Sequence, residues 1–403
     1  MPVLSRLSAY AGNPIEDTDE LAAKLKKEGK KIIKLNQGNP TAIFPTPKYI
    51  IDAYISALKE GKTGYSFHAG IPELRQAVAD RQNRSYNADF NFEDVIITQG
   101  VSESISFINS TFIDPNDRAV ILRPYYPTYL TFLETSGGAP LFADYSEKEG
   151  FKFNPDSLEK ALRRQRKTPK FMIFSNPCNP TGTVMRRGEL KEIVDIMNDH
   201  GIFLISDEIY DEIVFNGAKF TSISEVAKGA KYAIIGGASK NFDATGFRIG
   251  YIIVPGKDRV SVEVNRKIRD YAKMRLSSNT PAQYAFAMAL ENRKEHEKAI
   301  RGMVEKIKER VNRSCEVINE GKHMQVVRPN GAFYLLPRIE MKNLRLKNDL
   351  DVVEKLLVEE GVQVSRGSGF GAPDHIRIVA LAPEDILEFA IRKIDKFFVR
   401  HSK

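Results

Sequence analysis

Short apolar runs alternate with helix-period segments from about residue 48 to residue 284, and this alternation constrains the fold more than any other feature of the sequence. Helical periodicity is clear, for example, over residues 188–201. A strand that is apolar along its whole length is covered on both faces, so we expect an α/β protein with a mainly parallel sheet between helices. The expected strands are residues 95–100, 119–125, 171–176, 202–207, 232–237 and 247–254.

The pattern changes near residue 285. From there we expect an α+β module that begins with one long charged helix over residues 286–319. Because 403 residues exceed what one hydrophobic core organises, we expect more than one domain. The predicted parts are an extended arm (1–14), a large domain (48–284), and a small α+β domain built from residues 15–47 and 285–403.

Composition excludes several classes of protein. The net charge of +8 comes from 60 basic and 52 acidic residues that are mostly interleaved, which favours a solvated surface over a nucleic-acid patch. No apolar stretch approaches the roughly 18 residues of a membrane span, and the N-terminus lacks the apolar core of a signal peptide. The two cysteines, Cys178 and Cys315, have no zinc spacing and the histidines are scattered. We therefore expect a cytoplasmic protein without a metal site, a membrane segment or a nucleic-acid partner.

Residues suited to ligand binding follow the predicted strands where these end. In open α/β sheets, ligands bind beyond the carboxyl ends of the strands. One edge of the sheet is thus expected to collect a helix start, aromatic rings, an amide, a carboxylate and a lysine. In chain order these residues are Gly100, Val101, Ser102, Tyr126, Asn179, Asp207, Tyr210 and Lys240.

Lys240 stands directly beyond the apolar run 232–237. On its own it is most simply read as an exposed lysine. A lysine buried in a cleft has a lowered pKa, however, and is suited to form a Schiff base. The neighbours favour that second interpretation, with a phosphorylated aldehyde as cofactor. Asp207 would keep a pyridine nitrogen protonated, and Tyr210 and Asn179 would donate to the ring oxygen.

The phosphate of such a cofactor also finds suitable groups. The helix that opens at Gly100, Val101 and Ser102 offers free N–H groups and a positive dipole end. Arg248 would add a bidentate contact, and Tyr126 would lie on the face of the ring.

These motifs together resemble the fold-type I pyridoxal-phosphate aminotransferases of the aspartate, alanine and aromatic group. The resemblance runs from Gly38 to Arg377 and rests on the order and spacing of the motifs. It implies a seven-stranded, mainly parallel sheet, pyridoxal 5'-phosphate as cofactor, and transfer of an amino group between an amino acid and a 2-oxo acid. The matching segments are LNQGNP (35–40), GYSFHAGIPELRQAV (64–78), SNPCNPTG (175–182), SDEIY (206–210), SKNFDATGFRIGY (239–251), NGAFYLLP (330–337) and GSGFGAPDHIRI (367–378).

The resemblance also assigns roles to residues. Lys240 matches the Schiff-base lysine and catalytic base, and Asp207 matches the partner of the pyridine nitrogen. Tyr210 and Asn179 match the donors to the ring oxygen, and Arg248 matches the phosphate arginine.

Further roles concern the substrate and a second subunit. Arg377 matches the arginine that binds the substrate α-carboxylate, with Asn179 and the Gly38 backbone beside it. Tyr65 matches a tyrosine that reaches the phosphate in the neighbouring subunit, which implies a homodimer with shared active sites. Ser239, directly before Lys240, is expected to bind the cofactor.

One position departs from the family pattern. Where many members have a phosphate-binding serine, three residues before the lysine, this chain has Gly237.

We expect aspartate or alanine as amino donor and 2-oxoglutarate as acceptor. A second substrate carboxylate would need another cation, for which Arg275 is a candidate across the dimer, although it is equally read as a surface arginine. A β-lyase and an aromatic or broad-specificity aminotransferase are the alternatives.

Overall fold

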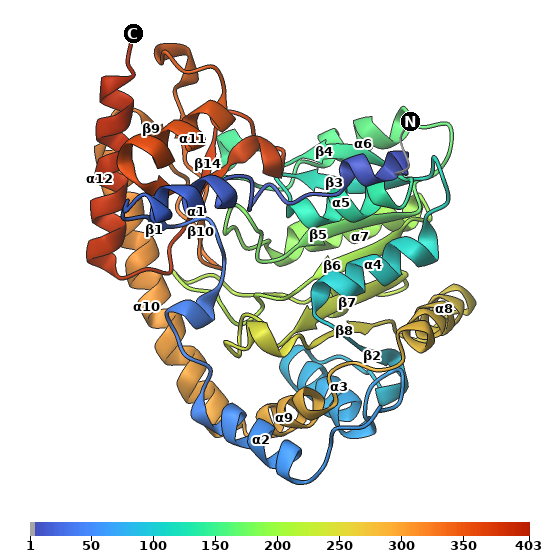
Figure 1. Ribbon diagram of the computed structural model, residues 1–403. Helices are drawn as coiled ribbons and strands as arrows, with labels where there is room; N and C mark the ends of the chain where they lie inside the picture. The colour runs from blue at the N-terminus through green and yellow to red at the C-terminus, as the bar shows by residue number, and fades with distance from the viewer. Residues whose placement is uncertain (1–4) are drawn as a thin grey trace.

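A seven-stranded sheet forms the centre of the protein in the computed structural model, which describes residues 5–403 (Figure 1). Every strand is parallel to its neighbours except β8, which is antiparallel to both β7 and β2. The sheet is therefore mainly parallel, as predicted. Its order is β2 (Val95–Thr98), β8 (Gly250–Ile253), β7 (Tyr232–Gly237), β6 (Phe203–Asp207), β5 (Phe171–Ser175), β3 (Arg118–Arg123) and β4 (Ala139–Asp144).

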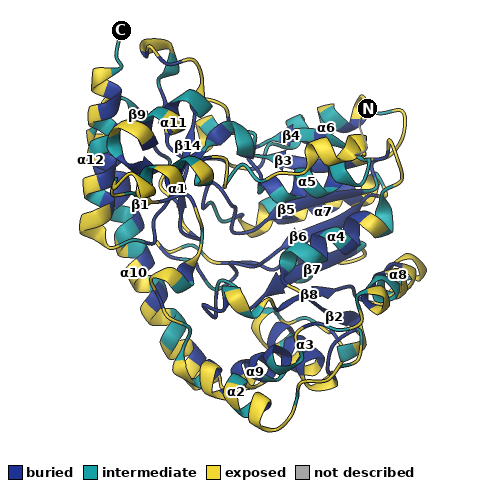
Figure 2. Ribbon diagram, in the orientation of Figure 1, coloured by how far each residue is buried: buried dark blue, intermediate teal, exposed yellow. Residues whose placement is uncertain are grey.

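Helices cover both faces of this sheet, because successive residues of each strand point to opposite sides. In β3, Ile121 packs into the cluster on one face and Leu122 into the cluster on the other. Figure 2 shows the strands as a buried layer between partly exposed helices. One face is covered by α4 (Val101–Phe112), α5 (Pro127–Thr135) and α8 (Arg259–Arg275). The other is covered by α3 (Pro72–Tyr86), α6 (Pro155–Arg163), α7 (Arg187–Asp199) and α9 (Thr280–Glu291), with α2 (Lys48–Lys59) packed on α9.

A third apolar cluster lies in the C-terminal part of the chain, left of the large sheet in Figure 1. Its helices are α10 (Arg293–Glu320), α11 (Asp349–Glu360) and α12 (Glu384–Arg400), and α1 (Asp19–Lys27) lies nearby. Its small sheets pair β1 (Ile33–Lys34) with β12 (Val362–Gln363), β9 (Met324–Gln325) with β11 (Arg338–Ile339), and β14 (Ile376–Val379) with β10 (Tyr334–Leu335) and β13 (Ser365–Arg366). Among the helices of residues 5–403, none has the length and apolar character to cross a membrane.

The structure corrects three expectations. The long helix predicted over residues 286–319 is two helices, because Asn292 leaves the helical conformation (φ −83°, ψ 61°) between α9 and α10. Strand β4 was not predicted; it contains Pro140, and it lies at the edge of the sheet, where proline is tolerated. The expected arm is not extended throughout, since a 3-10 helix (Arg6–Tyr10) packs near α5, while residues 1–4 lie outside the described part. The predicted domain boundary at 284/285 falls within α9, and the division into domains stays a prediction.

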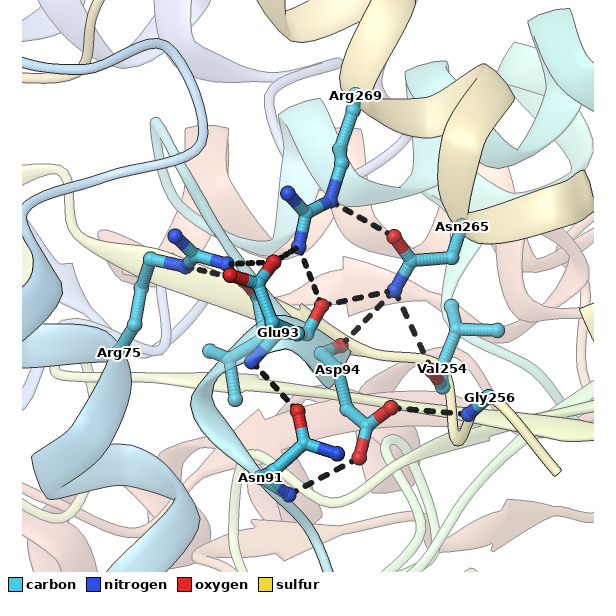
Figure 3. Close-up of polar contacts among 9 residues, drawn as sticks. Arg75, Asn91, Glu93, Asp94, Val254, Gly256, Asn265 and Arg269 are labelled. Atoms are coloured by element: carbon cyan, nitrogen blue, oxygen red, sulfur yellow. Dashed lines mark hydrogen bonds and ion pairs between the residues drawn. The ribbon is translucent and has the colours of Figure 1, made fainter. Parts of the chain in front are cut away.

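A network of polar contacts fixes the beginning of β2, the strand that leads to the predicted phosphate site (Figure 3). The buried Arg75 guanidinium donates through Nε to the Val95 carbonyl at 2.9 Å and pairs with Glu93 at 3.1 Å. Arg269 of α8 also pairs with Glu93, at 2.6 Å. Helices α3 and α8 are thereby joined to the same strand start.

Replacing Arg75 by methionine should lower the free energy of unfolding by about 2–4 kcal/mol, because a buried carbonyl and a carboxylate lose a charged donor. Urea unfolding followed by circular dichroism measures this. The matched control is Arg266→Met on α8, where an exposed arginine pairs with Glu263 and Asp270. It should cost less than about 1 kcal/mol. Equal losses in the two variants would contradict a structural role for the Arg75 network.

Candidate active site

The topology of the sheet explains why Lys240 and Arg248 meet. The parallel strands β2, β3, β5, β6 and β7 all end at the same edge, so the residues that follow them gather there. Strand β8 runs the opposite way, and its beginning, with Arg248 just before it, therefore lies beside the end of β7.

A cavity of about 400 Å³ opens at this edge. Most of the residues predicted for the site line it. These are Gly38, Val101, Ser102, Tyr126, Asn179, Asp207, Tyr210, Ser239, Lys240, Arg248 and Arg377. With three cations and one carboxylate among them, the cavity is suited to anionic ligands.

Lys240 lies in the loop after β7 and its Nζ donates to the Gly38 carbonyl at 2.7 Å. Burial, together with the positive charges of Arg377 and Arg248, lowers the pKa of Lys240 to about 8, against the opposing effect of Asp207. A substantial fraction of this amine is therefore neutral near pH 7 to 8, which is the form that attacks a carbonyl carbon.

Asp207 is the last residue of β6 and is 3% exposed. Its Oδ2 accepts a 2.6 Å hydrogen bond from the Tyr129 hydroxyl, and its Oδ1 accepts one from the Ile209 amide at 3.2 Å. Burial raises the pKa of this carboxyl to about 6, partly offset by the Tyr129 hydrogen bond. The carboxylate is thus held in one orientation and in a dry place, where a cationic partner is strongly favoured.

Tyr210 and Asn179 present donors from two neighbouring loops. The hydroxyls of Tyr210 and Tyr334 lie 2.6 Å apart. The Asn179 carbonyl oxygen accepts from Arg377 Nη1 at 3.1 Å, which turns the amide so that its NH₂ group remains as a donor.

The start of α4 lies at the cavity and offers donors for an anion. The first N–H groups of a helix have no partner within the helix, and here they belong to Val101 and Ser102. Gly100 precedes them with φ +75°, and a Cβ there would lie 2.5 Å from a guanidinium nitrogen of Arg248. Glycine at this position thus allows the arginine to approach the helix start.

The departure at Gly237 has a steric reason. A Cβ at this position would lie 2.6 Å from the Ile249 carbonyl oxygen and 2.8 Å from the Cα of Gly250, because β7 and β8 approach closely there. A serine does not fit without a backbone shift, so the chain offers one hydroxyl fewer on this side of the predicted phosphate site.

Arg377 lies on β14, the central strand of the three-stranded sheet β10-β14-β13, and is fully buried at 0% exposure. Its guanidinium donates to Asn179 and to the Asn36 carbonyl, and lies over the rings of Phe370 (4.4 Å) and Tyr334 (4.8 Å). Its Nε has no hydrogen-bond partner within the described part of the chain. A buried cation with an unused donor at the cavity wall is suited to bind a carboxylate.

Three candidates lie outside the cavity wall. Gly100 shapes it from the preceding position, as described above. Tyr65 is 83% exposed and lies on the surface with Phe67 and Leu276. Arg275 is not a free surface arginine, since it donates to the carbonyls of His68 and Ile97, both at 3.1 Å.

Two tyrosines of the site were not predicted. Tyr129 orients Asp207, and its signal was its position one helical turn after Tyr126. Tyr334 contacts Tyr210 and Arg377 and leaves no room for a Cβ at Gly38, where its hydroxyl would lie 2.3 Å away. It belongs to the motif at residues 330–337, but nothing in its spacing indicated which residue of that motif faces the cavity.

Comparisons with known proteins relate the whole chain to one family. The family model described as aminotransferase class I and II matches residues 30–394. The aspartate aminotransferase of Bacillus subtilis (strain 168) is 30% identical over 407 residues, covering 100% of both chains. The alanine aminotransferase of Mycobacterium bovis is 32% identical, covering 94% of this chain and 88% of that one. A solved structure of the alanine aminotransferase from Pyrococcus furiosus superposes with a TM-score of 0.93 at 33% identity, over 99% of this chain and 100% of that one.

Proposed function

The chain belongs to the class I and II aminotransferases, and we propose that it uses pyridoxal 5'-phosphate, held at Lys240, to move the amino group of aspartate or alanine to a 2-oxo acid. One observation carries the assignment of the site. Lys240, Asp207, Arg248 and Arg377 line the same cavity of about 400 Å³, although they come from separate parts of the chain.

The donor set fits this cofactor. Because Gly100 has no Cβ, the Arg248 guanidinium can lie beside the first N–H groups of α4. The guanidinium and these N–H groups together suit a phosphate dianion. Asp207 suits a protonated ring nitrogen, and the hydroxyl of Tyr210 and the NH₂ group of Asn179 suit the ring oxygen. Lys240 supplies the amine for the aldehyde carbon. The ring of Tyr126 offers a flat apolar surface for stacking.

When bound, the cofactor supplies an electron sink that stabilises negative charge at the substrate α-carbon. The chain's own residues direct that chemistry. Asp207 holds a proton on the ring nitrogen, and Arg377 holds the α-carboxylate so that the α-hydrogen faces Lys240. Lys240 Nζ, with its pKa lowered to about 8, would be the base that takes the proton from the α-carbon and the acid that returns it.

A homodimer is part of this proposal. Tyr65 (83% exposed), Met274 (79%), Leu276 (52%) and Phe67 (50%) are large apolar or aromatic side chains on the surface. Such exposure is typical of an interface, and Tyr65 would then reach the phosphate in the second subunit. A cytoplasmic location agrees with Cys178 and Cys315 being buried and unbridged.

Replacing Arg377 by leucine should lower kcat/KM for the amino donor by about 10²- to 10³-fold, mainly through KM, because the α-carboxylate loses its charged partner in a buried place. Steady-state kinetics with both substrates measure this. Arg366→Leu, on the neighbouring strand β13 and paired with Asp17 away from the cavity, is the matched control. If the two variants lose the same amount, Arg377 does not bind the carboxylate.

A panel of amino donors with 2-oxoglutarate as acceptor tests the function itself. Lys240, Arg248 and Arg377 are the cations facing the cavity from the described residues, and each already has a role. Alanine, with one carboxylate, therefore needs no further cation, whereas aspartate needs one from the partner subunit. Formation of ammonia and pyruvate without any acceptor would contradict an aminotransferase and indicate a β-lyase.

A further inference from the structure

A buried polar network lies directly behind Lys240 and Tyr210, on the side away from the cavity. Each of these residues is followed by a polar residue that is almost fully buried, namely Asn241 (5% exposed) and Asp211 (4%). The Asn241 amide NH₂ donates to Oδ1 of Asp211. One hydrogen bond therefore joins the loop after β6 to the loop after β7, at the positions next to the two site residues.

The second oxygen of Asp211 is held by α3. Its Oδ2 accepts from Arg81 Nη2 at 2.7 Å and from the Tyr86 hydroxyl at 2.7 Å. Arg81 is itself 7% exposed and also pairs with Glu212 at 3.0 Å. Asp211 thus connects both loops to a helix that packs against the sheet.

Burying the charged groups of this network costs desolvation free energy, which raises the question of their role. A buried arginine and a buried carboxylate, here Arg81 and Asp211, cost several kcal/mol each to take out of water, and apolar residues of similar size are often at least as stabilising. None of Arg81, Asp211 and Asn241 lines the cavity, so none contacts substrate. The network restricts the movement of two loops, the one after β6 and the one after β7, whose residues Tyr210 and Lys240 line the cavity.

We propose that Asp211, anchored by Arg81 and Tyr86, is a positioning residue that acts through Asn241 to hold Lys240 and Tyr210 in the orientation that proton transfer requires. This inference rests on the proposed function. Errors of about 1 Å in the placement of a reacting group reduce rates by about 10²-fold, so a rigid link between the two loops has a direct effect on turnover.

The geometry suggests a reciprocal exchange as the test. Asn241→Asp sets two carboxylates against each other and breaks the link. The double variant Asp211→Asn/Asn241→Asp restores it with reversed polarity, because the new amide oxygen accepts from Arg81 and its NH₂ group donates to the new carboxylate. Asn241→Ala removes the link without adding a charge, and serves if the first variant does not fold. Asp94→Asn is the matched control: a buried aspartate that accepts two backbone hydrogen bonds, at 3.0 Å and 2.9 Å, in the network of Figure 3.

Two kinds of measurement are made on each cofactor-loaded enzyme. Steady-state kinetics give kcat and KM, and the visible circular dichroism per bound cofactor reports the orientation of the cofactor without turnover. We expect Asn241→Asp and Asn241→Ala to lower kcat by about 10- to 100-fold with little change in KM, and to alter the dichroism. The exchange variant should recover most of both, and Asp94→Asn should retain both.

The failures are distinguishable. An active wild-type enzyme whose kcat and dichroism are unchanged in Asn241→Ala, or an exchange variant that folds and binds cofactor but remains as slow as Asn241→Asp, overturns the positioning role alone. A wild-type protein that transfers no amino group from any donor overturns the proposed function and the positioning role together.

Discussion

Lys240→Ala should lower transamination by at least about 10⁴-fold, the largest effect expected for any single substitution in this chain. The variant loses the amine that bonds the cofactor and the base that moves the α-proton, since both roles belong to one Nζ. In the structure this Nζ lies at the wall of the cavity, 2.7 Å from the Gly38 carbonyl, and no other lysine of residues 5–403 lines the space. Turnover and the visible absorbance of the purified, cofactor-loaded protein are measured together.

The control for this prediction is a lysine at the other end of β7. Lys231 directly precedes β7, at the end opposite to Lys240, and Lys231→Ala removes a lysine of the same segment without touching the cavity. It should retain wild-type turnover and absorbance. A Lys240→Ala enzyme that works as well as Lys231→Ala would refute the assignment of the lysine.

Asp207→Asn is expected to have the second largest effect, a loss of about 10²- to 10⁴-fold in kcat. Removing one partner of a buried charge pair costs about 3–5 kcal/mol, and each 1.36 kcal/mol is tenfold in rate. The amide keeps the size of the side chain and its oxygen still accepts from Tyr129, while its NH₂ group faces the Ile209 amide; the variant thus loses the charge that holds a proton on the ring nitrogen together with one backbone hydrogen bond. Single-turnover kinetics with an amino donor separate this loss from product release.

Glu208 provides the matched control for Asp207. It is the next residue, equally buried, and hydrogen-bonded to Ser222 and to the Ile223 amide. Burial raises the pKa of Glu208 to about 8, so it carries a proton at neutral pH and its replacement by glutamine removes no charge. Glu208→Gln should keep a rate close to that of the wild type. Similar losses in both variants would mean that disturbance of the loop, and not the charge of Asp207, lowers the rate.

The sequence predicted the large sheet and the residues at its edge because both depend on local patterns, whereas Gly38 and Arg377 were assigned by the family resemblance. Continuous apolar runs identify buried parallel strands, and residues after such strands meet at one edge whatever the details of packing. Strand β4 was missed because Pro140 interrupts its apolar run, and a proline within a run argues against a strand. The break between α9 and α10 escaped it because helical periodicity continues on both sides of Asn292.

Contacts between distant segments were the part that the sequence did not reveal. Tyr129 and Asp207 are 78 residues apart, so no local pattern pairs them. The same holds for Arg81 and Asp211, which are separated by 130 residues. The pattern showed which side chains reach the edge of the sheet, while the partners that orient them, and the commitment of Arg275 to backbone carbonyls, follow only from tertiary packing.

Borohydride reduction of the cofactor-loaded protein, followed by proteolysis and mass spectrometry, tests the central claim most directly. Reduction makes the bond between an amine and the cofactor aldehyde permanent, so the labelled peptide identifies the attachment point. The account predicts one modified peptide, carrying the cofactor on Lys240. Label on a different lysine, or no label after incubation with pyridoxal 5'-phosphate, would contradict it.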